Sequence, residues 1–205
     1  MIEIAIKKKI KTYNGFDLLD VRANFAGRSI TQILGNSGAG KTTLLKILAG
    51  LLLPEEGYIS VDNETWLDTK ANIFLSPQKR HTGFVFQDYA LFPNMTAEEH
   101  LRYGSADEEY INELFGIGQL EKFKQHKPRQ LSGGQQQRLA ILRSLATKPR
   151  ILLMDEPFSA LDNDLKGSII GDLKQLISRL EMTCLVVTHQ PFTEGEFVDF
   201  SFRID

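Results

Sequence analysis

The chain has 205 residues, of which 42% are hydrophobic and 24% charged, and its formal net charge is -2. This length and composition suffice for one α/β core with a small appended lobe. The balanced charge argues against a broad nucleic-acid-binding surface, and no run reaches the roughly 18 consecutive apolar residues of a membrane-spanning helix. The single cysteine, Cys184, excludes an internal disulfide and is consistent with a reducing compartment.

The first segment carries isoleucine at alternate positions, Ile2, Ile4 and Ile6, and again at Ile10. A period of two predicts a β-strand with one buried face. Lysines occupy much of the interval 7–11. We expect them on a solvated edge strand, where charge discourages edge-to-edge pairing, rather than in a nucleic-acid contact.

A glycine-rich segment follows the apolar run Ile30–Leu34, which predicts a buried strand. The segment consists of Gly35, Asn36, Ser37, Gly38, Ala39, Gly40, Lys41, Thr42 and Thr43. It fits the phosphate-loop pattern Gly-x-x-x-x-Gly-Lys-Ser/Thr, in which backbone N–H groups face the phosphates, Lys41 reaches the β and γ positions and Thr42 holds Mg²⁺. A helix is predicted from Lys41 to Leu48, ending at Gly50, so the phosphates would lie at a helix N-terminus.

Gln87 follows Val85 and Phe86, which we expect at the end of a strand, where α/β sheets place their ligands. A solvated side chain is the alternative for a lone glutamine. The next segment, 88–130, is punctuated by Gly116 and Gly118 and predicts short helices.

A second motif consists of Leu131, Ser132, Gly133, Gly134 and Gln135. The Ser-x-x-Gln spacing is that of a capping box, and leucines follow at helical spacing, so Ser132 is predicted to cap a helix that ends before Pro149. A capped helix is one interpretation. The other is that this N-terminus, left open by two glycines, offers N–H donors and its dipole to a phosphate.

Two carboxylates, Asp155 and Glu156, follow the apolar run 151–154. The run predicts a buried strand that ends beside the phosphate loop. A carboxylate near Mg²⁺ stays ionised, whereas its neighbour on the other side of the strand is free to act as a base. The alternative is an ordinary acidic strand end.

Two further elements are predicted near the C-terminus. Residues 164–181 carry apolar side chains at helical spacing and predict a helix that covers the core. A buried strand is predicted before Thr188, and His189 follows at its end. A lone histidine is usually structural, but this position again lies where a sheet places its ligands.

The phosphate loop, the motif 131–135 and the acidic strand end, followed by Ser159, Ala160, Leu161 and Asp162, together resemble the ATP-binding cassette (ABC) ATPases. The resemblance extends from the first strand to His189. It implies an α/β fold with a P-loop NTPase core, an antiparallel β edge subdomain and an inserted helical subdomain. We therefore expect a single domain, 1–205, with the core in 1–87 and 131–205 and the helical subdomain in 88–130.

The resemblance also implies roles for the site residues. Two copies would clamp ATP between the phosphate loop of one and the signature Ser132, Gly133, Gly134 and Gln135 of the other, with Asp162 in the D-loop. Asp155 would hold Mg²⁺ together with Thr42 and Gln87, Glu156 would polarise the attacking water, and His189 would contact the γ-phosphate. Gln87 would also couple its sensing of the metal and the attacking water to movement of the helical region. For the adenine ring, Tyr13 is the first candidate and Phe16 the second.

The string from Phe86 to Pro93 is similar to that of binding-protein-dependent importers, and its flanks 78–80 and 101–104 favour the molybdate/tungstate type. This implies permease subunits as partners, with Phe92 and Met95 as candidate contacts, a solute-binding protein acting indirectly, and a location at the cytoplasmic face of the membrane. Many such subunits continue into a C-terminal β-rich regulatory domain, which is not expected here because the chain stops at Asp205.

Two other classes of protein are alternatives to a transporter subunit. A soluble ABC-type ATPase of translation or DNA maintenance would carry tandem cassettes or a long coiled-coil insertion, and the chain carries neither. A stand-alone nucleotide-binding module would lack a base, whereas Glu156 is present. The sequence therefore predicts an ATPase with no nucleic-acid partner.

Overall fold

The structure is a computed structural model that describes residues 1–12, 15–161 and 163–204. It contains an antiparallel sheet in the order β2-β1-β4-β5-β6 and a parallel sheet in the order β10-β3-β9-β8-β7. The antiparallel strands are β1 (Ile2–Thr12), β2 (Gly15–Phe25), β4 (Glu56–Val61), β5 (Glu64–Asp68) and β6 (Ile73–Phe74). The parallel strands are β3 (Ile30–Leu34), β7 (Thr82–Val85), β8 (Ile151–Asp155), β9 (Thr183–Val187) and β10 (Phe200–Arg203).

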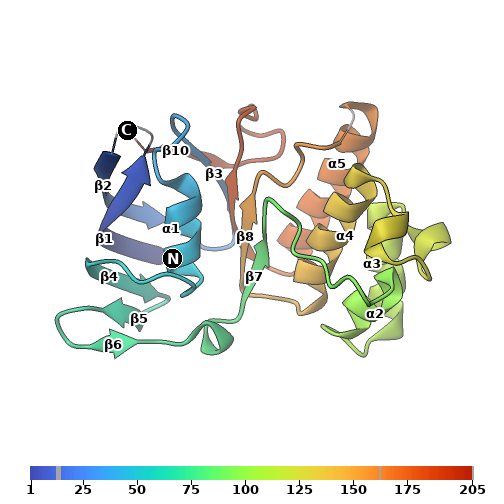
Figure 1. Ribbon diagram of the computed structural model, residues 1–205, viewed down its shortest axis with the longest axis horizontal. Helices are drawn as coiled ribbons and strands as arrows, with labels where there is room; N and C mark the ends of the chain where they lie inside the picture. Colours follow the sequence, from blue (N-terminus) through green and yellow to red (C-terminus); the bar gives the residue numbers. More distant parts are fainter. Residues whose placement is uncertain (13–14, 162, 205) are drawn as a thin grey trace.

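Helices lie between the sheets and beyond the parallel sheet (Figure 1). The α-helices are α1 (Lys41–Leu48), α2 (Ala97–Arg102), α3 (Glu108–Gly118), α4 (Gly133–Ala146) and α5 (Asn163–Arg179). Three short 3₁₀ helices are η1 (Pro77–Lys79), η2 (Glu121–Phe123) and η3 (Pro128–Gln130). α1 is packed between the two sheets, whereas α4 and α5 cover the opposite face of the parallel sheet (Figure 1).

Alternation along the parallel strands divides the core between these two layers. Leu152 and Met154 of β8 face the layer of α4 and α5, while Ile151 and Leu153 face α1. Both faces are apolar because helices cover both, which is why β8 is a continuous apolar run in the sequence. The predicted α/β core with an antiparallel sheet and inserted helices is confirmed.

The prediction of an edge strand at the N-terminus is wrong for the first half of β1. β1 pairs with β2 along its whole length and with β4 over residues 2–7, so it is an inner strand over that part. From Lys8 onward it pairs with β2 alone among the described strands. Lys7 forms an ion pair with Glu56 and Lys8 forms one with Glu55. Lys7, on the inner part of the strand, and Lys8 are therefore offset by acidic partners from the neighbouring segment.

The inserted segment forms a helical lobe against α4. Thr96 caps α2 in a capping box with Glu99, and Asp107 caps α3 by accepting a hydrogen bond from the Tyr110 N–H. α2 and α3 both pack on α4, so the lobe is anchored to the same helix that carries the motif 131–135. The subdomain bounds 88–130 stay a prediction.

Candidate functional site

Four sequence-predicted segments meet at one edge of the parallel sheet. β3, β9, β8 and β7 are consecutive neighbours and run in the same direction. The phosphate loop follows β3, His189 follows β9, Glu156 follows β8 and Gln87 follows β7. Because the carboxyl ends of parallel strands share an edge, this is where an open α/β sheet binds its ligands.

The phosphate loop closes around its own lysine. Lys41 is 7% exposed, and its Nζ donates hydrogen bonds to the carbonyl oxygens of Gly35 at 2.8 Å and Asn36 at 2.9 Å. Gly35 packs so tightly that an added Cβ would lie 2.6 Å from the Ile204 carbonyl oxygen. Asn36, Ser37 and Gly38 form the exposed rim of the loop.

The N-terminus of α1 has free hydrogen-bonding capacity. Gly40 takes the N-cap position with φ of 89°, a conformation that a side chain would disfavour. Among the residues that the structure describes, no side chain caps this helix, and its first turn contains no acidic residue. The first N–H groups and the helix dipole therefore face the loop without a compensating charge, as an anion site requires.

Asp155 is a buried carboxylate with an unused oxygen. Its exposed fraction is 2%, and Oδ1 has no hydrogen-bond partner among the described residues. Burial raises the pKa of Asp155 above its usual range, a hydrogen bond from Thr42 opposes the rise, and the neighbouring Glu156 adds to it.

These features fit a divalent cation. A buried, unsatisfied carboxylate oxygen is costly, and a cation beside it and the Thr42 hydroxyl would offset that cost. No cluster of three or more acidic, histidine or cysteine side chains that could hold a metal occurs in the described part of the chain. Mg²⁺ needs no such cage, because it is commonly bound by one or two protein ligands, waters and substrate phosphates. Gln87, exposed at the end of β7, stays a predicted third ligand.

Glu156 and His189 form a pair at the ends of β8 and β9. Glu156 Oε1 lies 2.7 Å from His189 Nε2, and the side chains are 15% and 57% exposed. The two residues line a hollow of about 190 Å³ with Thr188 and Lys166 among its other walls. A carboxylate that is mostly covered yet open on one side can accept a proton from a molecule in that hollow.

The backbone of Glu156 is strained. Its φ is 51°, in the left-handed region, which costs a non-glycine residue about 1 to 2 kcal/mol. The Glu156 N–H donates to the carbonyl of Val187 on β9 at 3.0 Å. Strain of this kind persists where neighbouring groups over-determine the conformation, and it concentrates at functional positions.

The predicted cap of α4 is confirmed. Ser132 Oγ accepts from the Gln135 N–H at 3.4 Å, and Gln135 Oε1 accepts from the Ser132 N–H at 2.8 Å. An added Cβ would meet nothing within 4 Å at Gly133 but would lie 3.1 Å from the Ala160 carbonyl oxygen at Gly134. Within the described residues, no hydrogen bond or ion pair joins this motif to the phosphate loop of the same chain.

Gln137 is a further residue near the site that was not predicted from the sequence; it is 1% exposed and hydrogen-bonds the loop after β8. The available signal was its position: three successive glutamines in a helix that is covered on several sides cannot all be solvated.

Tyr13 and Asp162 lie outside the described residues. Phe16, the second candidate for adenine, is on β2 and 80% exposed, so the adenine contact stays a prediction.

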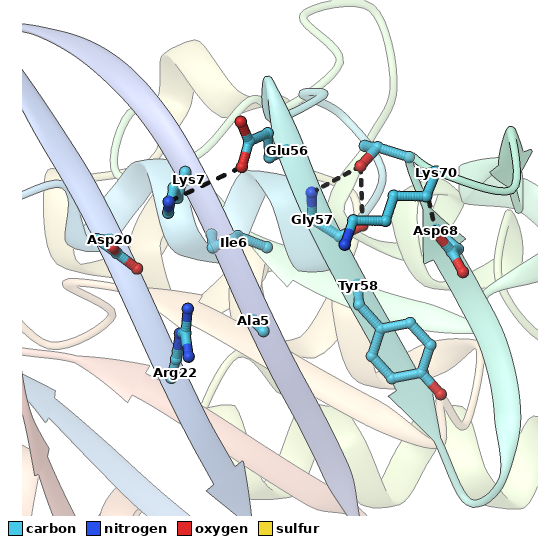
Figure 2. A pocket seen from close by; sticks show the side chains of 11 residues that line it. Ala5, Ile6, Lys7, Asp20, Arg22, Glu56, Gly57, Tyr58, Asp68 and Lys70 are labelled. Atoms are coloured by element: carbon cyan, nitrogen blue, oxygen red, sulfur yellow. Dashed lines mark hydrogen bonds and ion pairs between the residues drawn. The ribbon is translucent and has the colours of Figure 1, made fainter.

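A second hollow of about 370 Å³ lies on the outer face of the antiparallel sheet (Figure 2). Ala5 and Gly57 form part of it, and three basic and three acidic side chains surround them: Lys7, Arg22, Lys70, Asp20, Glu56 and Asp68. Its charges balance and it contains no phosphate-loop residue. The sheet edge, and not this hollow, is therefore the candidate site for phosphate chemistry.

The sequence from residue 18 to 159 matches the ABC transporter family, which is more than half of the chain. The chain belongs to the ABC transporter family. It is 41% identical, over 92% of its length, to the molybdenum import ATP-binding protein ModC of Haemophilus ducreyi, of which it covers 53%. It is 40% identical, over 92% of its length, to a probable sulfate/thiosulfate import ATP-binding protein CysA of Chlorella vulgaris, of which it covers 81%.

Solved structures of ABC cassettes have the same fold. The ATP-binding cassette MJ0796, in a dimeric post-hydrolysis state bound to ADP and Pi, superposes with a TM-score of 0.78 at 36% identity, covering 93% of this chain and 88% of that one. Another dimeric structure of MJ0796 gives a TM-score of 0.80 at 33% identity over 99% and 94%. The predicted ABC fold is confirmed. The chain spans about half the length of the ModC relatives that it matches.

Proposed function

We propose that the chain is the ATP-binding and ATP-hydrolysing subunit of a membrane importer, working as a pair of cassettes that clamp two ATP molecules. The observation that carries the proposal is the meeting of the phosphate loop, the buried Asp155 and the Glu156–His189 pair at one sheet edge. Each part serves a separate need of phosphoryl transfer: binding the phosphates, neutralising their charge and activating water.

Nucleotide entry would begin with Lys41. Its ammonium exchanges two loop carbonyls for the β- and γ-phosphates, while the N–H groups of the loop and of the first turn of α1 bind the remaining oxygens. Asp155 and Thr42 would hold Mg²⁺, which supplies neutralisation of the charge on the β- and γ-phosphates when bound. The cation would then offset the free-energy cost of burying Asp155 Oδ1 without a hydrogen-bond partner.

Glu156 would accept the proton of the attacking water, because its carboxylate reaches the hollow and His189 Nε2 holds it in place. His189 is exposed enough to contact a γ-phosphate at the same time. Both residues sit on short segments directly after buried strands, so their positions depend on the rigid sheet rather than on a long loop.

A second copy of the chain would complete each site. The capped N-terminus of α4 makes no polar contact with its own phosphate loop in the described residues, yet it is built to receive an anion. The dimeric structures of MJ0796, a cassette with 36% identity, support this assembly. ATP would then be held between the phosphate loop of one copy and Ser132 to Gln135 of the other.

A permease would dock in an apolar groove between the core and the helical lobe. The groove has a volume of about 300 Å³ and is lined by Leu51, Phe84, Phe86, Phe92 and Tyr103, among other residues. Phe92 is 41% and Tyr103 73% exposed, although exposed rings are costly in water. Met95, the other candidate contact, is only half-buried and does not line this groove.

The membrane would be reached through this partner, at its cytoplasmic face, since none of the helices described is long and apolar enough to cross a bilayer. The similarity to molybdenum and sulfate/thiosulfate import proteins supports an oxyanion such as molybdate as the cargo. The solute-binding protein would act on the permease and not on this chain.

Nucleotide titration tests the enzymatic part. We expect the purified chain to bind ATP and release phosphate in the presence of Mg²⁺, and Lys41→Ala to weaken ATP binding at least about tenfold because a charge-assisted contact is lost. Lys79→Ala, at an exposed lysine outside the site, is the control. Unchanged affinity in Lys41→Ala would contradict the phosphate-site assignment.

Coexpression with the permease tests the transport part. We expect the chain to fractionate with membranes, and Tyr103→Asp or Phe92→Asp to weaken this association while Phe74→Asp, at a ring 46% exposed on β6, leaves it intact. Equal effects of all three variants would contradict docking in the groove. Association with ribosomes or DNA instead of membranes would favour the soluble ABC-type ATPase.

A further inference from the structure

Gln137 connects the signature helix α4 to the loop that carries Glu156. Its Nε2 donates to the carbonyl oxygen of Glu156 at 3.1 Å and to Ser159 Oγ at 3.1 Å, and its Oε1 accepts from the Ala160 N–H at 2.9 Å. The side chain is 1% exposed, so water does not compete for these bonds.

The orientation of the amide is fixed by its partners. A backbone carbonyl only accepts and a backbone N–H only donates, so a flipped Gln137 would place like groups against each other on both sides. Three hydrogen bonds from one buried side chain therefore determine the orientation of the peptide that follows Glu156 and the path of the turn to Ala160.

This peptide belongs to the strained residue of the site. Glu156 has a left-handed backbone. Its N–H donates to Val187 on β9, and its carbonyl accepts from Gln137 on α4 as well as from the N–H and Oγ of Ser159 in the same turn. Gln137 is the partner of this carbonyl that comes from outside the turn, and it also binds Ser159 Oγ. Without it, the carbonyl would keep partners only from its own turn, so φ could relax and move the carboxylate away from its 2.7 Å contact with His189.

Gln137 also lies two residues after Gln135, on the first turns of the helix that Ser132 caps. In the proposed dimer, α4 begins at the ATP of the partner site, while Glu156 acts on the ATP of its own site. A shift of α4 when the partner's phosphate docks would thus be transmitted by a rigid side chain to the Glu156 peptide.

We propose that Gln137 is a positioning residue that sets the orientation of Glu156 and couples the two ATP sites of the dimer, a role that rests on the proposed function. The coupling element is the buried amide itself, which joins the signature helix of one site to the base of the other. Its loss would leave ATP binding intact but would disconnect occupation of one site from hydrolysis at the other.

The test uses the full chain with Gln137→Met, which keeps the side-chain length and removes all three hydrogen bonds. We expect kcat to fall at least about tenfold, the Kd for ATP to stay within about twofold, and the Hill coefficient for ATP to fall from above 1 toward 1. Tyr110→Phe is the matched control, because it removes one buried hydrogen bond to the Leu145 carbonyl at the far end of α4. It should lower stability and leave kcat and the Hill coefficient unchanged.

Gln137→Glu should give a pH dependence of kcat that a purely structural role of Gln137 would not produce. A protonated carboxyl can donate to the Glu156 carbonyl and accept from Ala160, whereas an ionised one repels that carbonyl. We expect its kcat relative to the unmodified chain to rise as pH falls from 8 to 6, while the ratio for Gln137→Met stays flat.

An active, cooperative chain in which Gln137→Met behaves like Tyr110→Phe would overturn the inference. A flat pH ratio for Gln137→Glu would overturn it as well. Failure of the unmodified chain to hydrolyse ATP would instead contradict the proposed function, so the two failures are distinguishable.

Discussion

Two loops at the edge of the parallel sheet contain non-glycine residues in the left-handed region. In the loop after β8, this residue is Glu156 with φ of 51°, and in the loop after β7 they are Tyr89 with 64° and Ala90 with 46°. A polar side chain from α4 holds each loop. Gln137 binds the first, while Arg143 donates to the carbonyl oxygens of Tyr89 and Ala90 in the second.

The side chains that bind the two loops differ in charge. A neutral amide can bind the Glu156 backbone without competing for the Glu156 carboxylate, which a guanidinium would pair with. The carboxylate of the loop after β7, Asp88, is exposed and accepts no proton in the proposed mechanism. This loop is bound by Arg143 and by His100, whose ring is 0% exposed and stacks on Phe92. Helix α4 therefore fixes the proposed catalytic loop with the neutral Gln137, whereas the proposed docking loop is fixed by the charged Arg143 of α4 and the titratable His100 of α2.

The largest expected difference between the loops is in the loss of ATP hydrolysis when a side chain of each is substituted. Glu156→Gln keeps the shape of the side chain but removes the proton acceptor, so we expect ATP binding to persist and hydrolysis to fall at least about 100-fold. ATP-bound dimers should accumulate in size-exclusion chromatography. Gln87→Ala, at the start of the other loop, removes no base and should cost less. Equal losses in phosphate release would break the distinction between a catalytic and a docking loop.

The next effect concerns stability. Arg143→Met removes hydrogen bonds to two carbonyls and the contact of the guanidinium with the Phe92 ring, whose centroid lies 5.4 Å away. We expect the free energy of unfolding in urea to fall by about 2 kcal/mol, with the basal ATPase rate of the isolated chain nearly unchanged. Arg129→Met, at an exposed arginine of η3, is the control. A loss of ATPase activity matching that of Gln137→Met would show that both loops serve catalysis.

Local signals in the sequence predicted much of this architecture. The strand before the phosphate loop, helix α1 with Gly50 just past its end and the capping box at Ser132 all depend on residues within a few positions of one another. β8 and β9 were recognisable because strands covered on both faces are continuous apolar runs.

Contacts between distant segments could not be predicted in this way. The two-sided pairing of β1 depends on where β4 returns to the sheet, which no period in residues 2–12 reveals. The functions of Gln137 and Arg143 likewise depend on loops that lie far away in the sequence. Tyr89 and Ala90 gave no signal either, because neither is a glycine or an asparagine, the residues that usually mark left-handed backbone.

The contribution of His100 to fixing the loop after β7 should depend on pH. His100 Nε2 accepts from the Phe92 N–H at 2.9 Å, so its Nδ1 carries the proton and donates to the Thr96 carbonyl at 2.7 Å. Burial, and to a lesser degree Arg143, lowers the pKa of His100, while the bond to Thr96 and the neighbouring Glu99 oppose this shift.

The sign follows from linkage. Since the folded pKa lies below the unfolded value of about 6.5, the unfolded chain binds the proton first, and the stability present above that pH is lost as pH falls through the folded pKa. We expect the free energy of unfolding of the unmodified chain to fall relative to that of His100→Gln between pH 7.5 and 5.5, by at most about 1.4 kcal/mol per pH unit. Parallel curves for the two proteins would show that His100 does not hold the loop through its neutral form.

The smallest expected effect isolates backbone strain from side-chain contacts. Ala90 is exposed and contributes its carbonyl, not its methyl group, to the Arg143 contact. Ala90→Gly therefore keeps this hydrogen bond and removes the cost of a left-handed backbone at a residue with a side chain. The greater freedom of glycine in the unfolded chain offsets part of the gain, so we expect a net stabilisation of about 0.5 to 1 kcal/mol. Ala140→Gly, in the interior of α4, should instead destabilise by about 1 kcal/mol or more. Destabilisation by both variants would mean that the loop after β7 is relaxed, and the strain shared by the two loops would then be confined to Glu156.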